Sequence, residues 1–153
     1  MFQCDRSLTR RSALLSLPAL ALLSRPAHAV EPVPLLFEQL YKSMGVRGLV
    51  FSDMVQALKG QPVAMRGYMA PPLKPESRFF VLTREPMALC PFCQSDADWP
   101  ADIVVVYLDR TTPLLGGGEA VVVRGRLEVG SATDLETGFV SQLRIVDAVF
   151  RHA

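Results

Sequence analysis

Five short strand-like segments dominate the sequence after Gly60. They are separated by turns rich in proline and glycine, and they cover residues 62–69, 78–83, 102–108, 120–129 and 139–150. Within 120–129, valine and leucine alternate with arginine and glutamate, so that one face of the segment is apolar and the other is charged. Successive side chains of a β-strand point to opposite faces, and this alternation therefore predicts half-buried strands.

Two glycines inside these segments indicate how the strands are arranged. Gly67 and Gly125 lie within otherwise regular strand patterns, and small curved sheets use glycine at bends and bulges. Five strands at this spacing predict a mainly β protein, built as a closed or partly closed five-stranded antiparallel barrel. A β-sandwich is the competing architecture.

The residues before the strands predict a short helical lead-in. Apolar residues over 35–44 recur at spacings of three and four, which favours a helix. A second helical turn is expected from Asp53, with Ser52 as its N-cap and Gly60 as its stop. A chain of 153 residues is long enough for one hydrophobic core. We divide its residues after position 29 into an N-terminal helical lead-in over 30–51 and a barrel domain over 52–153.

The first 29 residues have the pattern of a signal peptide. A basic start is followed by an apolar run over 13–23, too short to span a bilayer, and then by an Ala-x-Ala cleavage site at Ala27 and Ala29. The pair Arg10-Arg11 resembles a twin-arginine signal. We therefore expect export to the periplasm by the twin-arginine route. No later segment is apolar for long enough to form a transmembrane helix in the mature chain.

One motif of the mature chain carries chemistry, the run Cys90-Pro91-Phe92-Cys93. An oxidising compartment favours a disulfide between these cysteines. They are also consistent with a structural staple of the loop, or with part of a zinc or copper site. The further metal ligands would come from a second copy of the chain, or from Asp96 or Asp98 together with His152, the only histidine of the mature chain.

Several enzyme classes lack their sequence signals. A thioredoxin-like site needs a long helix after the motif, whereas about eight residues separate Cys93 from the next strand. Covalent haem attachment needs a histidine at position 94, which is Gln94. The formal net charge of +1 argues against a general nucleic-acid binder. We predict a binding or accessory protein rather than an enzyme, and a thiol–disulfide redox protein is the alternative.

Residues 52–151 resemble a family of small exported bacterial proteins of unknown function. The resemblance rests on the opening motif at 60–71, the cysteine-containing loop at 90–93 and the strand pair over 120–129 and 139–150. It implies an oligonucleotide/oligosaccharide-binding (OB) type of barrel. It also implies an accessory role at the outer face of the membrane, with components of a metal-related transport system as partners. This chain lacks the histidine that many members place after the first cysteine.

Overall fold

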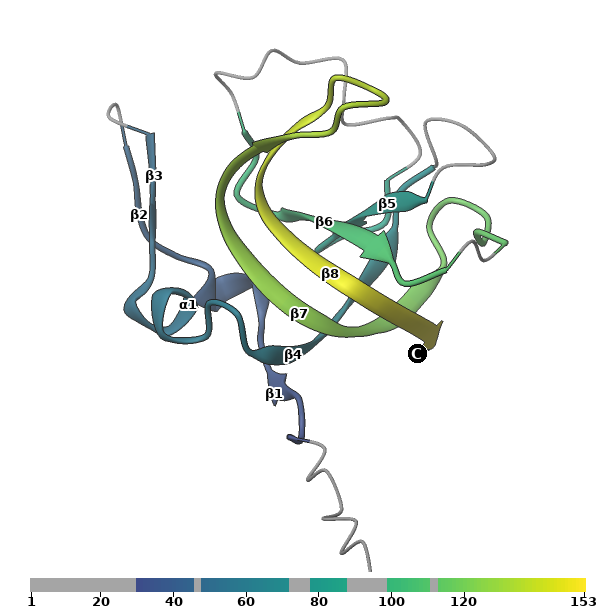
Figure 1. Ribbon diagram of the computed structural model, residues 1–153, viewed down its shortest axis with the longest axis horizontal. Coiled ribbons are helices and arrows are strands. Elements are labelled where there is room, and N and C mark those ends of the chain that lie inside the picture. Colours follow the sequence, from purple (N-terminus) through teal and green to yellow (C-terminus); the bar gives the residue numbers. More distant parts are fainter. Residues whose placement is uncertain (1–29, 46–47, 72–77, 88–98, 111–112) are drawn as a thin grey trace, which may run out of the picture.

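The computed structural model describes residues 30–45, 48–71, 78–87, 99–110 and 113–153, in which β-strands predominate (Figure 1). The helical elements of these residues are a 3-10 turn, η1 (Phe37–Gln39), and one short helix, α1 (Asp53–Ala57). None of the helices in the described residues is long and apolar enough to cross a membrane. The mainly β prediction is confirmed.

Five strands form the barrel, and they match the five predicted segments closely. They are β4 (Pro62–Met69), β5 (Phe79–Thr83), β6 (Ile103–Leu108), β7 (Ala120–Thr133) and β8 (Val140–His152). The strand order is β4-β5-β6-β8-β7, and β7 also pairs with β4, so the pairing runs around the barrel (Figure 1). This Greek-key order is that of an OB-like barrel.

The barrel differs from the predicted one in the direction of one strand pairing. The pairing of β6 with β8 is parallel, so the sheet is mixed and not antiparallel throughout. The register between β4 and β5 holds two residue pairs, Tyr68 with Thr83 and Met69 with Leu82, so the barrel is only partly closed at this seam, which is one of the two predicted forms. The parallel pairing arises from the order of the strands. After β6 the chain continues into β7, which lies antiparallel beside β4, and β8 then returns antiparallel to β7 and lies parallel beside β6.

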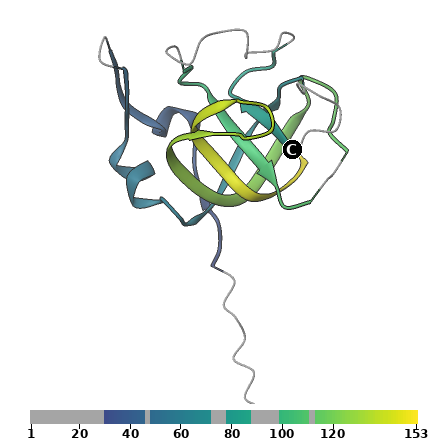
Figure 2. The same ribbon diagram turned by 45° about the horizontal axis from the view of Figure 1, so that its top comes forward.

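The N-terminal residues form a different structure from the predicted helix. β1 (Val33–Pro34) pairs with β4, while β2 (Tyr41–Gly45) and β3 (Gly48–Phe51) form a separate two-stranded sheet beside the barrel (Figures 1 and 2). The helix predicted over 35–44 is therefore wrong except for η1. Its apolar residues do not share one helical face, because Leu35 and Leu40 are buried in the barrel core whereas Leu36 is 55% exposed.

The second predicted helical turn is confirmed in detail. The Ser52 Oγ accepts a hydrogen bond from the Val55 backbone N–H at 3.1 Å, which caps α1. After the helix, Gly60 adopts a φ of +79°, a conformation that favours glycine. This short helix and its cap lead the chain into β4.

Of the two internal glycines, Gly125 lies at a β-bulge as expected, whereas Gly67 pairs with Val121 in regular register. Between Arg124 and Arg126 the β7–β8 register shifts, and β8 contributes one extra residue at this bulge. Asp147 lies at the bulge with a φ of 51°. A side chain at position 125 would collide with β8, since its Cβ would lie 2.6 Å from the carbonyl oxygen of Val146.

Candidate functional site

The Cys-x-x-Cys motif lies in the connection between β5 and β6. Cys90, Cys93, Asp96 and Asp98 fall within 88–98, outside the described residues. The signal-peptide residues also fall outside the described residues, and they are Arg10, Arg11, Ala27 and Ala29. The residues on either side of 88–98 are described, and they show where on the barrel the motif is attached.

The two stems of this connection are joined by backbone and side-chain contacts. The Arg84 backbone N–H donates to the carbonyl oxygen of Asp102 at 3.1 Å, one residue beyond the β5–β6 ladder on each side. The Thr83 hydroxyl lies 2.7 Å from the carbonyl oxygen of Glu85 and 3.2 Å from that of Tyr68. The stems therefore leave the barrel side by side, tied to both β4 and each other.

Trp99 fastens the second stem to the N-terminal hairpin. Its indole Nε1 donates to the Tyr41 hydroxyl oxygen at 3.0 Å, and its ring lies 6.4 Å from the ring of Phe139. Tyr41 in turn stacks on Phe51 across the β2–β3 hairpin, with ring centroids 5.3 Å apart. A residue adjoining the cysteine-containing segment is thus connected to residues 58 positions away in the sequence.

A hollow of about 570 Å³ lies where the hairpin base meets the two stems. Its lining combines two aromatic rings with charges of both signs, from Phe37, Glu38, Tyr41, Lys42, Arg84 and Asp102. Pockets that bind small molecules commonly have volumes of about 300–1,000 Å³ and combine apolar walls with a few polar groups. The volume of the hollow falls within this range, and its lining includes both aromatic and polar groups.

The charged groups around the hollow differ in how they are paired. The Lys42 Nζ lies 3.4 Å from the Asp53 carboxylate, and the Arg84 guanidinium lies 3.5 Å from the Glu85 carboxylate. Within the described residues, no ion pair or side-chain hydrogen bond engages the carboxylates of Glu38 and Asp102. The anionic groups of the lining are thus free for a ligand, whereas both cations already have carboxylate partners.

Tyr41 is electrostatically perturbed at this site. Burial raises its pKa to about 12; the hydrogen bond from Trp99 opposes this shift and the negative charge of Asp102 adds to it. An ordinary tyrosine is already neutral at physiological pH, and burial extends the neutral range of Tyr41 to higher pH. Since its oxygen accepts from Trp99, the hydroxyl proton remains available to a ligand in the hollow.

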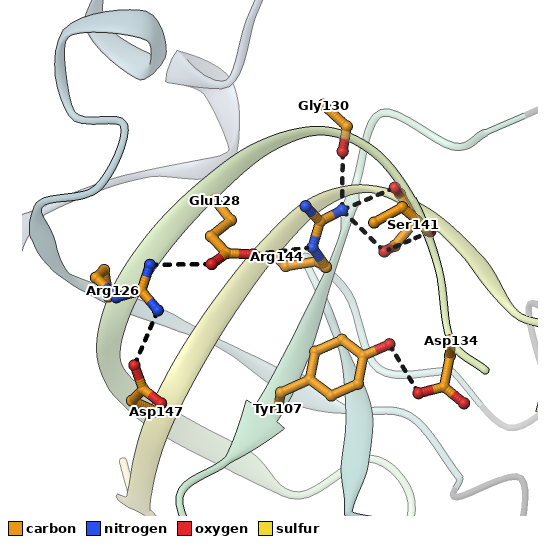
Figure 3. A network of polar contacts seen from close by, with 9 residues as sticks. Tyr107, Arg126, Glu128, Gly130, Asp134, Ser141, Arg144 and Asp147 are labelled. Atoms are coloured by element: carbon orange, nitrogen blue, oxygen red, sulfur yellow. Dashed lines mark hydrogen bonds and ion pairs between the residues drawn. The ribbon is translucent and has the colours of Figure 1, made fainter. Parts of the chain in front are cut away.

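A second group of polar residues lies on the outside of the barrel, on β7 and β8 (Figure 3). The buried Arg144 donates from Nη1 to the carbonyl oxygens of Gly130 at 2.8 Å and Ser141 at 3.0 Å. Its Nε lies 3.4 Å from the Glu128 carboxylate, which also pairs with Arg126 at 2.9 Å. The Arg144 guanidinium thus supplies hydrogen-bond donors to backbone carbonyl groups near the register shift between Val129 and Ala132. We therefore assign this network a structural role.

The turn between β7 and β8 covers the outer face of β5 and β6. The Phe139 ring stacks on Phe79 with centroids 5.9 Å apart, and the Tyr107 hydroxyl donates to the Asp134 carboxylate at 3.3 Å (Figure 3). Phe79 is 5% exposed and belongs to a small apolar cluster on this outer face. OB-type barrels commonly bind ligands on the corresponding face, and here the chain's own turn packs against it.

The structure does not bring His152 to the stems of the cysteine-containing segment. β8 runs parallel to β6, with Val105 opposite Arg144 and Leu108 opposite Ala148. His152 therefore lies beyond the Leu108 end of β6, whereas the cysteine-containing segment joins β6 at its Ile103 end. Within the described residues, no group of three or more His, Cys, Asp or Glu side chains could hold a metal ion.

The lining residues of the hollow were not predicted from the sequence. Glu38 and Tyr41 belong to the N-terminal hairpin region, whereas Arg84 and Asp102 flank the cysteine-containing segment. No spacing pattern relates such distant positions. The one available signal was Trp99, the single tryptophan of the chain, which follows the cysteine motif.

No protein-family model matches the sequence, and no curated protein matches it significantly. Among solved structures, the chain is similar to a crystal structure of a DUF3299 family protein from Pseudomonas aeruginosa PAO1. The TM-score is 0.45 at 14% sequence identity, and the match covers 80% of this chain and 97% of that chain.

Proposed function

We propose that this chain is an exported accessory protein of the periplasm that binds a ligand beside its Cys-x-x-Cys segment. The observation that supports this proposal best is the hollow of about 570 Å³ between the N-terminal hairpin and the stems of that segment. The proposal of export rests on the signal-peptide pattern of residues 1–29. A binding role suits a lining that offers charged groups and aromatic rings without a paired nucleophile and base.

The number of residues between the stems and the cysteines limits how far the cysteines can lie from the hollow. Cys90 lies six residues after Arg84, and Cys93 lies nine residues before Asp102. A fully extended chain covers at most about 3.6 Å per residue, so the first cysteine is within roughly 20 Å of the Arg84 backbone. The segment that carries the motif therefore starts and ends at residues that line the hollow, and we propose that one ligand or partner contacts both.

Metal handling is the more specific form of this proposal. Cysteine thiolates suit zinc and copper, and Asp96 or Asp98 would supply a carboxylate ligand. The partners in this form are components of a membrane transport system, which would receive or deliver the ion. In the alternative form, Cys90 and Cys93 cycle between dithiol and disulfide.

A native mass spectrum of the protein isolated from the periplasm tests the proposal. A stoichiometric metal or small-molecule adduct supports ligand binding, and a metal adduct should disappear when Cys90 and Cys93 are both replaced by serine. A mass two hydrogens lower without an adduct would favour the redox alternative. A reduced chain without any adduct would contradict a resident ligand.

Export is tested separately with the arginine pair. A variant with Arg10→Lys and Arg11→Lys should remain in the cytoplasm with its first 29 residues attached, because the twin-arginine route requires the pair. An Arg6→Lys variant is the matched control and should be exported. Normal processing of the double variant would contradict the twin-arginine route.

A further inference from the structure

We propose that the hollow binds the cationic end of a small organic molecule, an ammonium or guanidinium group held by the carboxylates of Glu38 and Asp102 against the ring of Tyr41. This inference rests on the proposed function, since it names the ligand class of the same hollow. It uses only residues that the structure describes, and it does not depend on the state of the cysteines.

The pairing of charges around the hollow determines the sign of the ligand. Lys42 and Arg84 are each within 3.5 Å of a carboxylate, whereas Glu38 and Asp102 have no cationic partner within the described residues. An anionic ligand would compete with Asp53 and Glu85 for these two cations. A cationic ligand would meet free carboxylates and would form charge-assisted hydrogen bonds with them.

The aromatic part of the lining favours an organic cation. Phe37 and Tyr41 both face the hollow, and the face of an aromatic ring attracts ammonium and guanidinium groups. The Tyr41 phenol is neutral at physiological pH, as an ordinary tyrosine is, and burial raises its pKa further, to about 12. The Trp99 indole holds the Tyr41 oxygen at 3.0 Å, so this ring is fixed in place before a ligand arrives.

The described lining does not match a bare metal ion. Zinc sites take four ligands and calcium sites six to eight, whereas the described part of the hollow contributes two carboxylates. A volume of about 570 Å³ is also far larger than the roughly 30 Å³ that one water molecule occupies in the liquid. The space suits a ligand with a cationic group on an apolar body.

Three probes of nearly the same shape isolate the effect of charge: benzylamine, benzyl alcohol and benzoate. Trp99 is the single tryptophan of the chain, and its contact with Tyr41 makes its fluorescence, excited at 295 nm, a reporter for the hollow. We expect benzylamine to bind with a dissociation constant on the order of millimolar, because so small a ligand makes few contacts. Benzyl alcohol should bind more weakly, and benzoate most weakly.

Charge-neutralising variants assign the effect to named residues. Glu38→Gln and Asp102→Asn should each weaken benzylamine binding by roughly threefold to fivefold, the range of an exposed ion pair. Lys42→Met should strengthen it by a similar factor, because a competing positive charge is removed. Glu119→Gln is the matched control, since Glu119 is exposed, has no ion pair within the described residues and lies outside the lining.

The outcomes separate this inference from the proposed function. Tighter binding of benzoate, weakened by Lys42→Met, would overturn the cationic preference but leave a ligand-binding hollow. Equal binding of all three probes would likewise overturn it. Failure of all three probes would refute the inference, while the native mass spectrum of the periplasmic protein would still decide whether a ligand is bound at all.

Discussion

Replacing Gly67 with alanine tests how tightly β4 and β5 are joined beside the candidate site. A Cβ at this position would lie 2.6 Å from the carbonyl oxygen of Thr83, 2.9 Å from Leu82 Cγ and 3.0 Å from Phe37 Cε2. Non-bonded heavy atoms prefer separations of about 3.5–4.0 Å. The neighbours must therefore retreat by roughly 0.5–1 Å, and the Thr83 oxygen cannot swing away because it belongs to the backbone.

The cost follows from this crowding. Overpacking a well-filled core destabilises a protein by about 1–3 kcal/mol. Replacing glycine in a strand recovers about 0.5–1 kcal/mol, because alanine has less backbone entropy to lose. We expect a net loss of about 1–2 kcal/mol, which lowers the Tm of a domain of this size by roughly 3–10 °C.

Urea and thermal unfolding of the mature chain, followed by circular dichroism, measure this loss. Gly116→Ala is the matched control, because no heavy atom lies within 4 Å of its Cβ and its φ is not positive. The control should stay within about 0.5 kcal/mol of the unmodified protein. If Gly67→Ala were as stable as Gly116→Ala, the close approach of β4, β5 and Phe37 would be refuted.

Three further changes have predictable effects. Ser52→Ala should cost about 1–2 kcal/mol in urea unfolding, since the Ser52 hydroxyl caps α1 and donates to the Gln39 carbonyl oxygen at 2.5 Å, whereas Ser52→Thr should retain most of the stability. Arg144→Met should cost about 2–4 kcal/mol, because it leaves the acceptors of Gly130 and Ser141 unpaired; a loss below 0.5 kcal/mol would contradict their burial. Burial raises the pKa of Tyr41 to about 12, so its contribution to stability is complete below about pH 10 and is lost as the pH rises through 12. The stability of Tyr41→Phe should therefore depend less on pH over that range, and identical profiles would contradict the buried phenol.

The strands were predictable because their residues obey a local rule. On β7, Val121, Val123 and Leu127 are buried and Arg124 and Arg126 are exposed, as the alternation predicts. The parallel pairing of β6 with β8 was not predictable in this way. It depends on how the β7–β8 hairpin closes the barrel, and no periodicity within a single strand carries that information.

The predicted helix over 35–44 shows how tertiary structure overrides a local pattern. The helical spacing is present, yet Leu35 and Leu40 are needed to close the barrel core, and Tyr41 stacks on Phe51 in a hairpin. Burying these side chains in separate places contributes more stabilising free energy than packing one short amphipathic helix would. The candidate site depends on the same rearrangement, because Tyr41 lies beside Trp99 only in the hairpin arrangement.

The position of the hollow follows from a difference between two surfaces, the outer face of β5 and β6 and the surface at the stems that follow β5 and precede β6. The outer face is packed by Phe139 and fixed by the bond between Tyr107 and Asp134, so its aromatic groups are used within the fold. At the stems, the Trp99–Tyr41 hydrogen bond holds the hairpin beside the barrel and leaves a space lined by the carboxylates of Glu38 and Asp102, which have no ion-pair partner in the described part of the chain. Glu38 is exposed and Asp102 is half-buried, so leaving both without a cation among the described residues costs the fold little, and the two carboxylates remain available to the cationic ligand that we propose.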